Sequence, residues 1–161
     1  MSLDPIDWLA SLLLGWRERK NHALADHSAQ VRKLVFGLSL DNAKERAERV
    51  LQQGGSFSVT RSHGSTRPEL FQDLAPSLQQ FFGAYERVQQ TRGDARLDAS
   101  VIGPSNVDRG YIRIGEDLDL AEVLVRPGDD RVFETEPGNR PALEAPSVWH
   151  WIVLLDALQR R

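Results

Sequence analysis

Cysteine is absent from this 161-residue sequence. Its absence excludes disulfide bonds, thiolate metal sites and a cysteine nucleophile, and it fits a reducing compartment. The sequence also lacks any run near the roughly 20 apolar residues that a membrane-spanning helix needs. The nearest candidate, residues 9–16, has acidic residues before it and basic residues after it, which reverses the charge order of a signal peptide. We therefore expect a cytoplasmic protein that does not bind membranes.

An excess of positive charge is missing too. The chain has 23 acidic and 20 basic residues, and its formal net charge is −3. Proteins that bind nucleic acids through phosphate contacts are usually basic. This balance predicts a protein that does not bind nucleic acid.

Motifs for catalysis, cofactors and metals are absent as well. The sequence has no Walker A motif, no glycine-rich nucleotide fingerprint, no His-Glu-x-x-His pair and no serine nucleophile elbow. A calcium loop counted from Asp117 needs glycine where Glu122 stands and glutamate where Gly128 stands, so that pattern fails. Glu116 and Glu122 offer two carboxylates but no further sign of a glycosidase. We expect no cofactor, no bound metal and no enzymatic activity.

What the chain does contain is typical of one globular domain. Hydrophobic residues make up 40% of the sequence and charged residues 27%, and a length of 161 residues suits one domain. We predict a single domain over residues 1–161. Its N-terminal part, 1–53, is predicted to be helical, and 54–161 to form an α+β core.

Apolar residues recur at helical spacing in four segments, 5–20, 41–53, 76–88 and 146–159. Asp4 is a suitable N-cap for the first helix, whose predicted apolar face includes Leu12, Leu13 and Trp16. Residues 21–37 hint at only one or two helical turns. Gly83 lies inside the third predicted helix, where glycine costs about 1 kcal/mol relative to alanine. We interpret it as a point of close packing against another element.

Short apolar stretches bounded by turn residues predict strands over 57–60, 97–102, 111–114, 121–126 and 131–135. The connections between the last three are short, which favours an antiparallel meander. Runs of strands beside runs of helices indicate the α+β class. We expect an antiparallel sheet of about four to six strands packed with helices, and extra helices at the N-terminus.

Three segments resemble motifs of the SUKH superfamily, the group that includes cell-wall assembly regulators and many bacterial immunity proteins. Residues 74–85 are similar to its early proline-led helix. Residues 110–115, with 122–125 and 131–134, are similar to its central strands, and 146–152 to its closing helix. The resemblance implies a compact α+β domain that binds another protein, in bacteria often a toxin delivered by a neighbouring cell.

Acidic residues are concentrated between positions 114 and 136. They are Glu116, Asp117, Asp119, Glu122, Asp129, Asp130, Glu134 and Glu136, against the two basic residues Arg126 and Arg131, which gives this segment a charge of −6. A negative surface can steer a basic partner and cover a cationic active site, such as that of a nuclease toxin. The alternative is that solvent-exposed hairpin turns are simply acidic. We predict a partner-binding surface formed by the first six of these acids.

Trp149 is a further candidate for this surface. It neighbours Trp151, and successive helical residues point about 100° apart. One tryptophan can then lie in the core while the other serves as an exposed anchor. The alternative is that both lie in the core.

These features predict a non-enzymatic immunity protein that binds and inhibits a cognate toxin, expected to be basic and nuclease-like. Inhibition would be steric and electrostatic. The alternative function is a regulatory or scaffolding domain that binds an endogenous protein. A third class, a small-molecule binder or divergent enzyme, would be favoured by a deep polar pocket with convergent titratable side chains. The sequence leaves open whether the protein is a monomer or a dimer.

Overall fold

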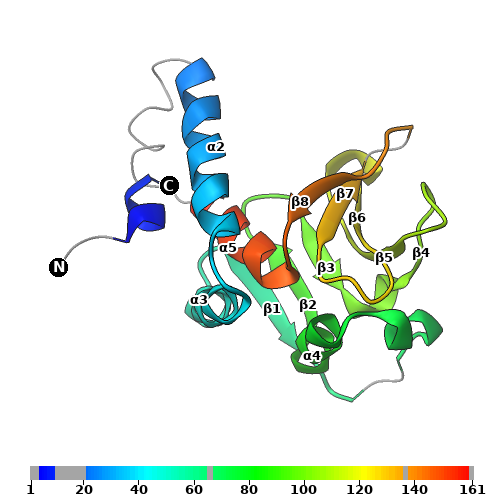
Figure 1. Cartoon of the computed structure of the whole chain (residues 1–161). Helices are drawn as coiled ribbons and strands as arrows, with labels where there is room; N and C mark the ends of the chain where they lie inside the picture. The colour runs from blue at the N-terminus through cyan, green and yellow to red at the C-terminus, as the bar shows by residue number, and fades with distance from the viewer. Residues whose placement is uncertain (1–3, 10–20, 65–66, 136–137, 160–161) are drawn as a thin grey trace. The chain divides into compact units, whose positions relative to one another are not determined.

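The computed structural model describes residues 4–9, 21–64, 67–135 and 138–159 (Figure 1). The chain divides into two compact units. The helical unit comprises residues 1–56 and 149–161, and the sheet unit comprises residues 57–148. The predicted α+β class is confirmed, because the chain combines helices with an antiparallel sheet. A single domain over 1–161 stays a prediction.

Within the described residues the sheet has eight strands, where the sequence predicts four to six. They are β1 (Phe57–Arg61), β2 (Tyr85–Gln90), β3 (Arg96–Asp98), β4 (Gly103–Pro104), β5 (Ile112–Glu116), β6 (Glu122–Val125), β7 (Val132–Thr135) and β8 (Ala142–Ala145). The order is β1-β2-β3-β5-β6-β7-β8, and β4 pairs with β5 outside this path (Figure 1). The predicted meander is confirmed for β5, β6 and β7.

The predicted helix over 76–88 is correct only in its first part. α4 (Pro76–Ala84) is followed directly by β2, whose Tyr85 and Val88 are both buried. Residues three apart share a face of a helix but lie on opposite faces of a strand. In β2, however, Arg87 pairs with Thr60 and Tyr85 pairs with Arg61, so Glu86 is an extra residue that shifts the alternation. Tyr85 and Val88 therefore share one face of β2, at a spacing that also suits a helix. A Cβ at Gly83 would meet nothing within 4 Å, so the predicted close packing there is wrong.

Two other strands differ from the prediction for local reasons. The strand predicted over 97–102 ends at Asp98, because the Asp98 carboxylate accepts a hydrogen bond from Ser100 N at 2.9 Å and begins a short 3-10 turn. β8 has no counterpart in the prediction. It is an edge strand whose first two residues are exposed, so it lacks the alternation that identifies half-buried strands.

The helical unit contains α2 (Asn21–Phe36), α3 (Leu40–Gln53) and α5 (Val148–Gln159), and residues 5–9 are helical too. Asp4 caps the first of these helical segments, since its Oδ1 accepts from Ile6 N at 2.8 Å. The rest of the predicted helix over 5–20, with Leu12, Leu13 and Trp16, lies outside the described residues. α2 is longer than the predicted one or two turns, and no glycine or proline interrupts it before Gly37.

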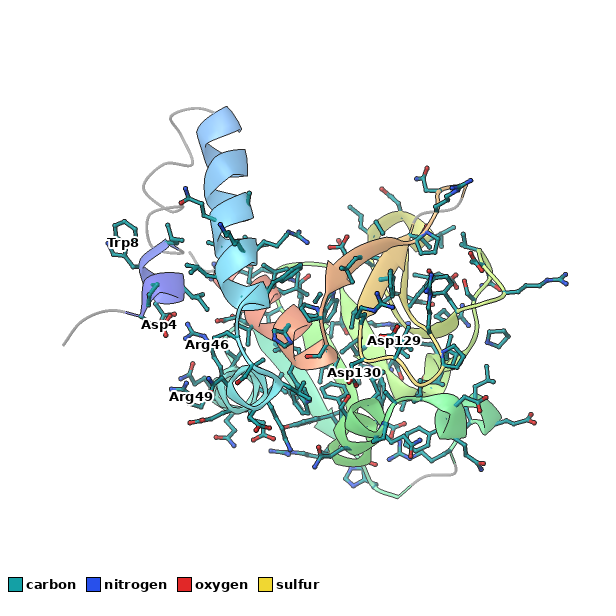
Figure 2. All side chains as sticks on the ribbon, in the orientation of Figure 1. Asp4, Trp8, Arg46, Arg49, Asp129 and Asp130 are labelled. Atoms are coloured by element: carbon teal, nitrogen blue, oxygen red, sulfur yellow. The ribbon has the colours of Figure 1, made fainter. Side chains whose placement is uncertain are left out.

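Arg46 connects the N-terminal helical turn to α3, within the helical unit. Its guanidinium lies 2.9 Å from Asp4 Oδ2 and 2.7 Å from Asp7 Oδ1. Burial raises the pKa of the Asp4 carboxyl, but the hydrogen bond from Ile6 and the charge of Arg46 outweigh it and leave that pKa below its usual value. Figure 2 shows Asp4 and Arg46 facing each other, while Trp8 points away.

Candidate functional site

The structure separates the six predicted acids into two groups. Glu116, Asp117, Asp119 and Glu122 lie at the β5–β6 connection. Asp129 and Asp130, which Figure 2 labels, lie at the β6–β7 connection. Successive turns of an antiparallel meander lie at opposite ends of the strand they share. The four residues of β6 separate the two groups by about 13 Å at the usual rise per residue. The acids therefore do not form one continuous surface.

A pocket of about 290 Å³ lies at the β5–β6 end of the sheet. It is lined by Asn106, Val107, Arg113, Glu116, Asp117, Leu120 and Glu122. Three of the predicted acids are thus brought together, whereas Arg113, Leu120 and the two residues from the 105–111 loop are not predicted from the sequence. The sequence offers one sign that Arg113 could belong to a site. It directly precedes the Ile-Gly pair of a predicted strand.

A β-bulge in β5 explains why Arg113 and Glu116 line the same pocket. Residues three apart lie on opposite faces of a regular strand. Here Arg113 pairs with Leu124 and Gly115 pairs with Val123, so Ile114 is an extra residue without a partner of its own. One inserted residue shifts the alternation of the strand. Arg113 and Glu116 then share the face that carries Glu122.

Glu122 forms the floor of the pocket and is 4% exposed. Its carboxylate accepts hydrogen bonds from Ser105 Oγ at 2.7 Å and from Asn106 N at 3.0 Å, and it lies 3.6 Å from Arg113 Nη1. These bonds fasten the 105–111 loop to the sheet. The carboxylate is engaged within the protein and is not a surface contact.

Glu116 lies directly opposite Glu122 across the β5–β6 pair. Like charges at such positions destabilise a sheet. An arginine beside each glutamate offsets the repulsion, since Arg96 Nη2 lies 2.8 Å from Glu116 and Arg113 neighbours Glu122. Two of the four acids at this end are therefore neutralised locally.

Replacing Glu122 by alanine is expected to lower the free energy of unfolding by about 2 kcal/mol, because the buried Ser105 hydroxyl and the part-buried Asn106 N–H lose their acceptor. The matched control is Glu116→Ala, which removes the opposite, half-exposed carboxylate and is expected to cost at most about 0.5 kcal/mol. Urea unfolding of both variants measures the difference. Equal effects would contradict the structural role assigned to Glu122.

The turn between β5 and β6 has an unusual backbone. Ala121 N donates to Leu118 O at 3.2 Å, and the two residues between them, Asp119 and Leu120, have φ of 59° and 65°. Positive φ is tolerated by glycine and asparagine but is unfavourable for leucine. Asp117 supports the turn, since its carboxylate accepts from Leu118 N at 2.7 Å.

This turn exposes apolar and acidic side chains together. Leu118 is 58% exposed and Leu120 is 81% exposed. Among the described residues, neither Asp117 nor Asp119 forms a salt bridge with a basic side chain. The turn therefore presents two exposed leucines that alternate with two carboxylates, neither of which has a salt-bridge partner among the described residues. The acids are predicted from the sequence and the leucines are not, because a count of charge along residues 114–136 gives apolar residues no weight.

The acids at the other end of β6 are bound within the protein. Arg131 lies 2.6 Å from Asp129, and its hydrogen bond lowers the pKa of the Asp129 carboxyl although burial acts in the opposite direction. Asp130 accepts a hydrogen bond from Ser77 Oγ at the start of α4. These contacts give both residues a role in holding the β6–β7 turn.

Trp149 belongs to the helical unit and is 2% exposed. Trp151 is buried as well, so the interpretation that places both tryptophans in the interior holds. The ammonium of Lys44 lies 5.8 Å from the centre of the Trp149 ring. Trp149 is not available as a surface anchor.

Comparisons with known proteins return no match: no family model, curated protein or solved structure is similar enough to the chain. The resemblance to the SUKH superfamily therefore stays a prediction. Within the part of the chain that the structure describes, no three histidine or acidic side chains gather as metal ligands. None of the helices described combines the length and the apolar character that a membrane crossing requires.

Proposed function

We propose that this chain is a non-enzymatic binding protein of SUKH type, an immunity protein that occupies and inhibits a toxin with a basic surface. The observation that carries the proposal is the β5–β6 turn, where the exposed Leu118 and Leu120 alternate with carboxylates that form no salt bridge among the described residues. An apolar centre with a charged rim is the usual anatomy of a protein interface. The resemblance of residues 74–158 to SUKH motifs supplies the class of partner.

The charge of the turn specifies the expected kinetics. Unpaired carboxylates attract a basic partner over a distance near the Debye length, about 8 Å at physiological salt. Such steering raises the association rate and weakens as salt is added. An inhibitor of this kind would block its target by covering it, without turnover.

The pocket beside the turn supports binding better than catalysis. Glu122 already accepts hydrogen bonds from Ser105 and Asn106, and Glu116 is paired with Arg96. The Ser105 hydroxyl donates to Glu122 and accepts from Val107 N and Asp108 N, so it is held as part of the loop. These groups stabilise the sheet end that carries the exposed turn.

The test is to purify a tagged copy of the full chain from its source cell and identify the proteins retained with it by quantitative mass spectrometry. We expect one basic protein in stoichiometric amount, whose toxic activity the purified chain abolishes. A housekeeping protein in its place would favour the regulatory or scaffolding alternative. Retention of no protein would contradict the proposal.

A further inference from the structure

Leu120 is placed where neither backbone nor packing favours a leucine. Its φ of 65° lies in the left-handed region, which leucine rarely adopts. Its side chain is 81% exposed, so it gains little burial within this protein. Asparagine followed by glycine is the usual choice for two adjacent turn residues with positive φ, and here aspartate and leucine stand in their place. Stability of the free protein does not explain this residue.

We infer that Leu118 and Leu120 are anchor residues that insert into an apolar pocket of the partner, and that basic residues surround that pocket. The inference rests on the proposed function and adds where and how the partner is held. The basic rim follows from charge complementarity, because Asp117 and Asp119 alternate with the leucines along the turn and form no salt bridge among the described residues. Strain kept at an exposed site is expected where function requires it.

The other exposed leucines of the described chain lack this combination. Leu143 lies in edge strand β8 and Leu40 at the first turn of α3, at 47% and 42% exposure. Neither has positive φ. Isolated exposed leucines are ordinary on protein surfaces, which makes Leu143 a suitable comparison for Leu120.

The first measurement needs no partner. Leu120→Gly in the full chain is expected to raise Tm by about 2–4 °C, because glycine adopts the left-handed conformation without strain. Leu143→Gly is expected to lower Tm or leave it unchanged, since β8 needs no positive φ. A fall in Tm for Leu120→Gly would show that Leu120 packs within the fold, and would overturn the inference.

The second measurement locates the contact. A photo-crosslinking amino acid is placed at position 120, or at position 143, of the full chain in its source cell. The protein captured at position 120 is then produced recombinantly and used as the titrant. We expect Leu120→Gly to weaken its binding about tenfold, and Leu120→Met and Leu143→Ala to change it less than threefold.

The outcomes separate this inference from the proposed function. Capture at 120 but not at 143 of a toxin with a basic surface, followed by the tenfold loss, supports both, whereas the same result with a housekeeping protein supports the anchor role and contradicts the proposed function. If the tagged chain retains a toxin but no adduct forms at 120, or Leu120→Gly binds as tightly as the wild type, the anchor inference fails while the proposed function stands. If no protein is retained at all, both fail.

Discussion

Gly115→Ala is expected to cost about 3 kcal/mol of folding free energy or more. A Cβ at this position would lie 2.0 Å from Arg96 O and 3.1 Å from Leu97 Cα, both in the backbone of β3. Backbone atoms of a paired strand cannot yield without breaking its hydrogen bonds. Among the described strands, β3–β5 is the pair that joins β1 and β2 to β6, β7 and β8, so the clash would separate the two halves of the sheet.

Gly83→Ala is the matched control for this prediction. It adds the same methyl group to the last turn of α4, where a Cβ meets nothing within 4 Å. Alanine is the better helix former, so this variant is expected to be neutral or more stable by up to about 1 kcal/mol. Denaturant unfolding followed by circular dichroism compares the two. A midpoint for Gly115→Ala close to that of the wild type would contradict the close approach of β3 and β5.

Removing both carboxylates of the turn, Asp117→Asn with Asp119→Asn, is expected to weaken partner binding about a hundredfold at low salt. Close charge pairs across interfaces contribute about 1.5 kcal/mol or more each, and two such losses correspond to that factor. Asparagine keeps the hydrogen-bond acceptor beside Leu118 and tolerates positive φ. The change therefore removes charge while the turn is retained.

Surface plasmon resonance with the identified partner, at several salt concentrations, measures this effect. The loss is expected mainly in the association rate and should shrink as salt is raised. Asp130→Asn is the control, because Asp130 lies at the opposite end of β6 and accepts a bond from Ser77. Equal losses for the double variant and for Asp130→Asn would show that the partner does not distinguish the two ends of the sheet.

Much of the fold follows from local patterns in the sequence. α3 begins after Ser39, whose Oγ accepts from Asn42 N at 3.1 Å, and ends at Gly54 with φ of 74°. Its buried residues recur at the helical spacing that predicts a helix over 41–53, and they are Ala43, Ala47, Val50 and Leu51. Capping, periodicity and turn residues agree there, which is why the prediction succeeds.

The candidate site was harder to predict because it depends on pairing between strands. The bulge at Ile114 brings Arg113 and Glu116 to one face, and no single-strand pattern reveals it. Neighbouring turns of the meander carry similar acidic residues, yet antiparallel pairing places Asp117 and Asp130 at opposite ends of β6. A sum of charge along residues 114–136 groups all of these acids together. The strand pairing shows that they lie in two separate groups.

Hydrogen–deuterium exchange of the full chain, free and bound to its partner, tests whether the β5–β6 turn is the contact surface. We expect slower exchange on binding for the amides of residues 117–121, which form the β5–β6 turn. Residues 127–131, at the other end of β6, should exchange at the same rate in both states. The contradicting result is protection of residues 127–131, or of α3, while residues 117–121 exchange at an unchanged rate. The β5–β6 turn would then not be the contact surface.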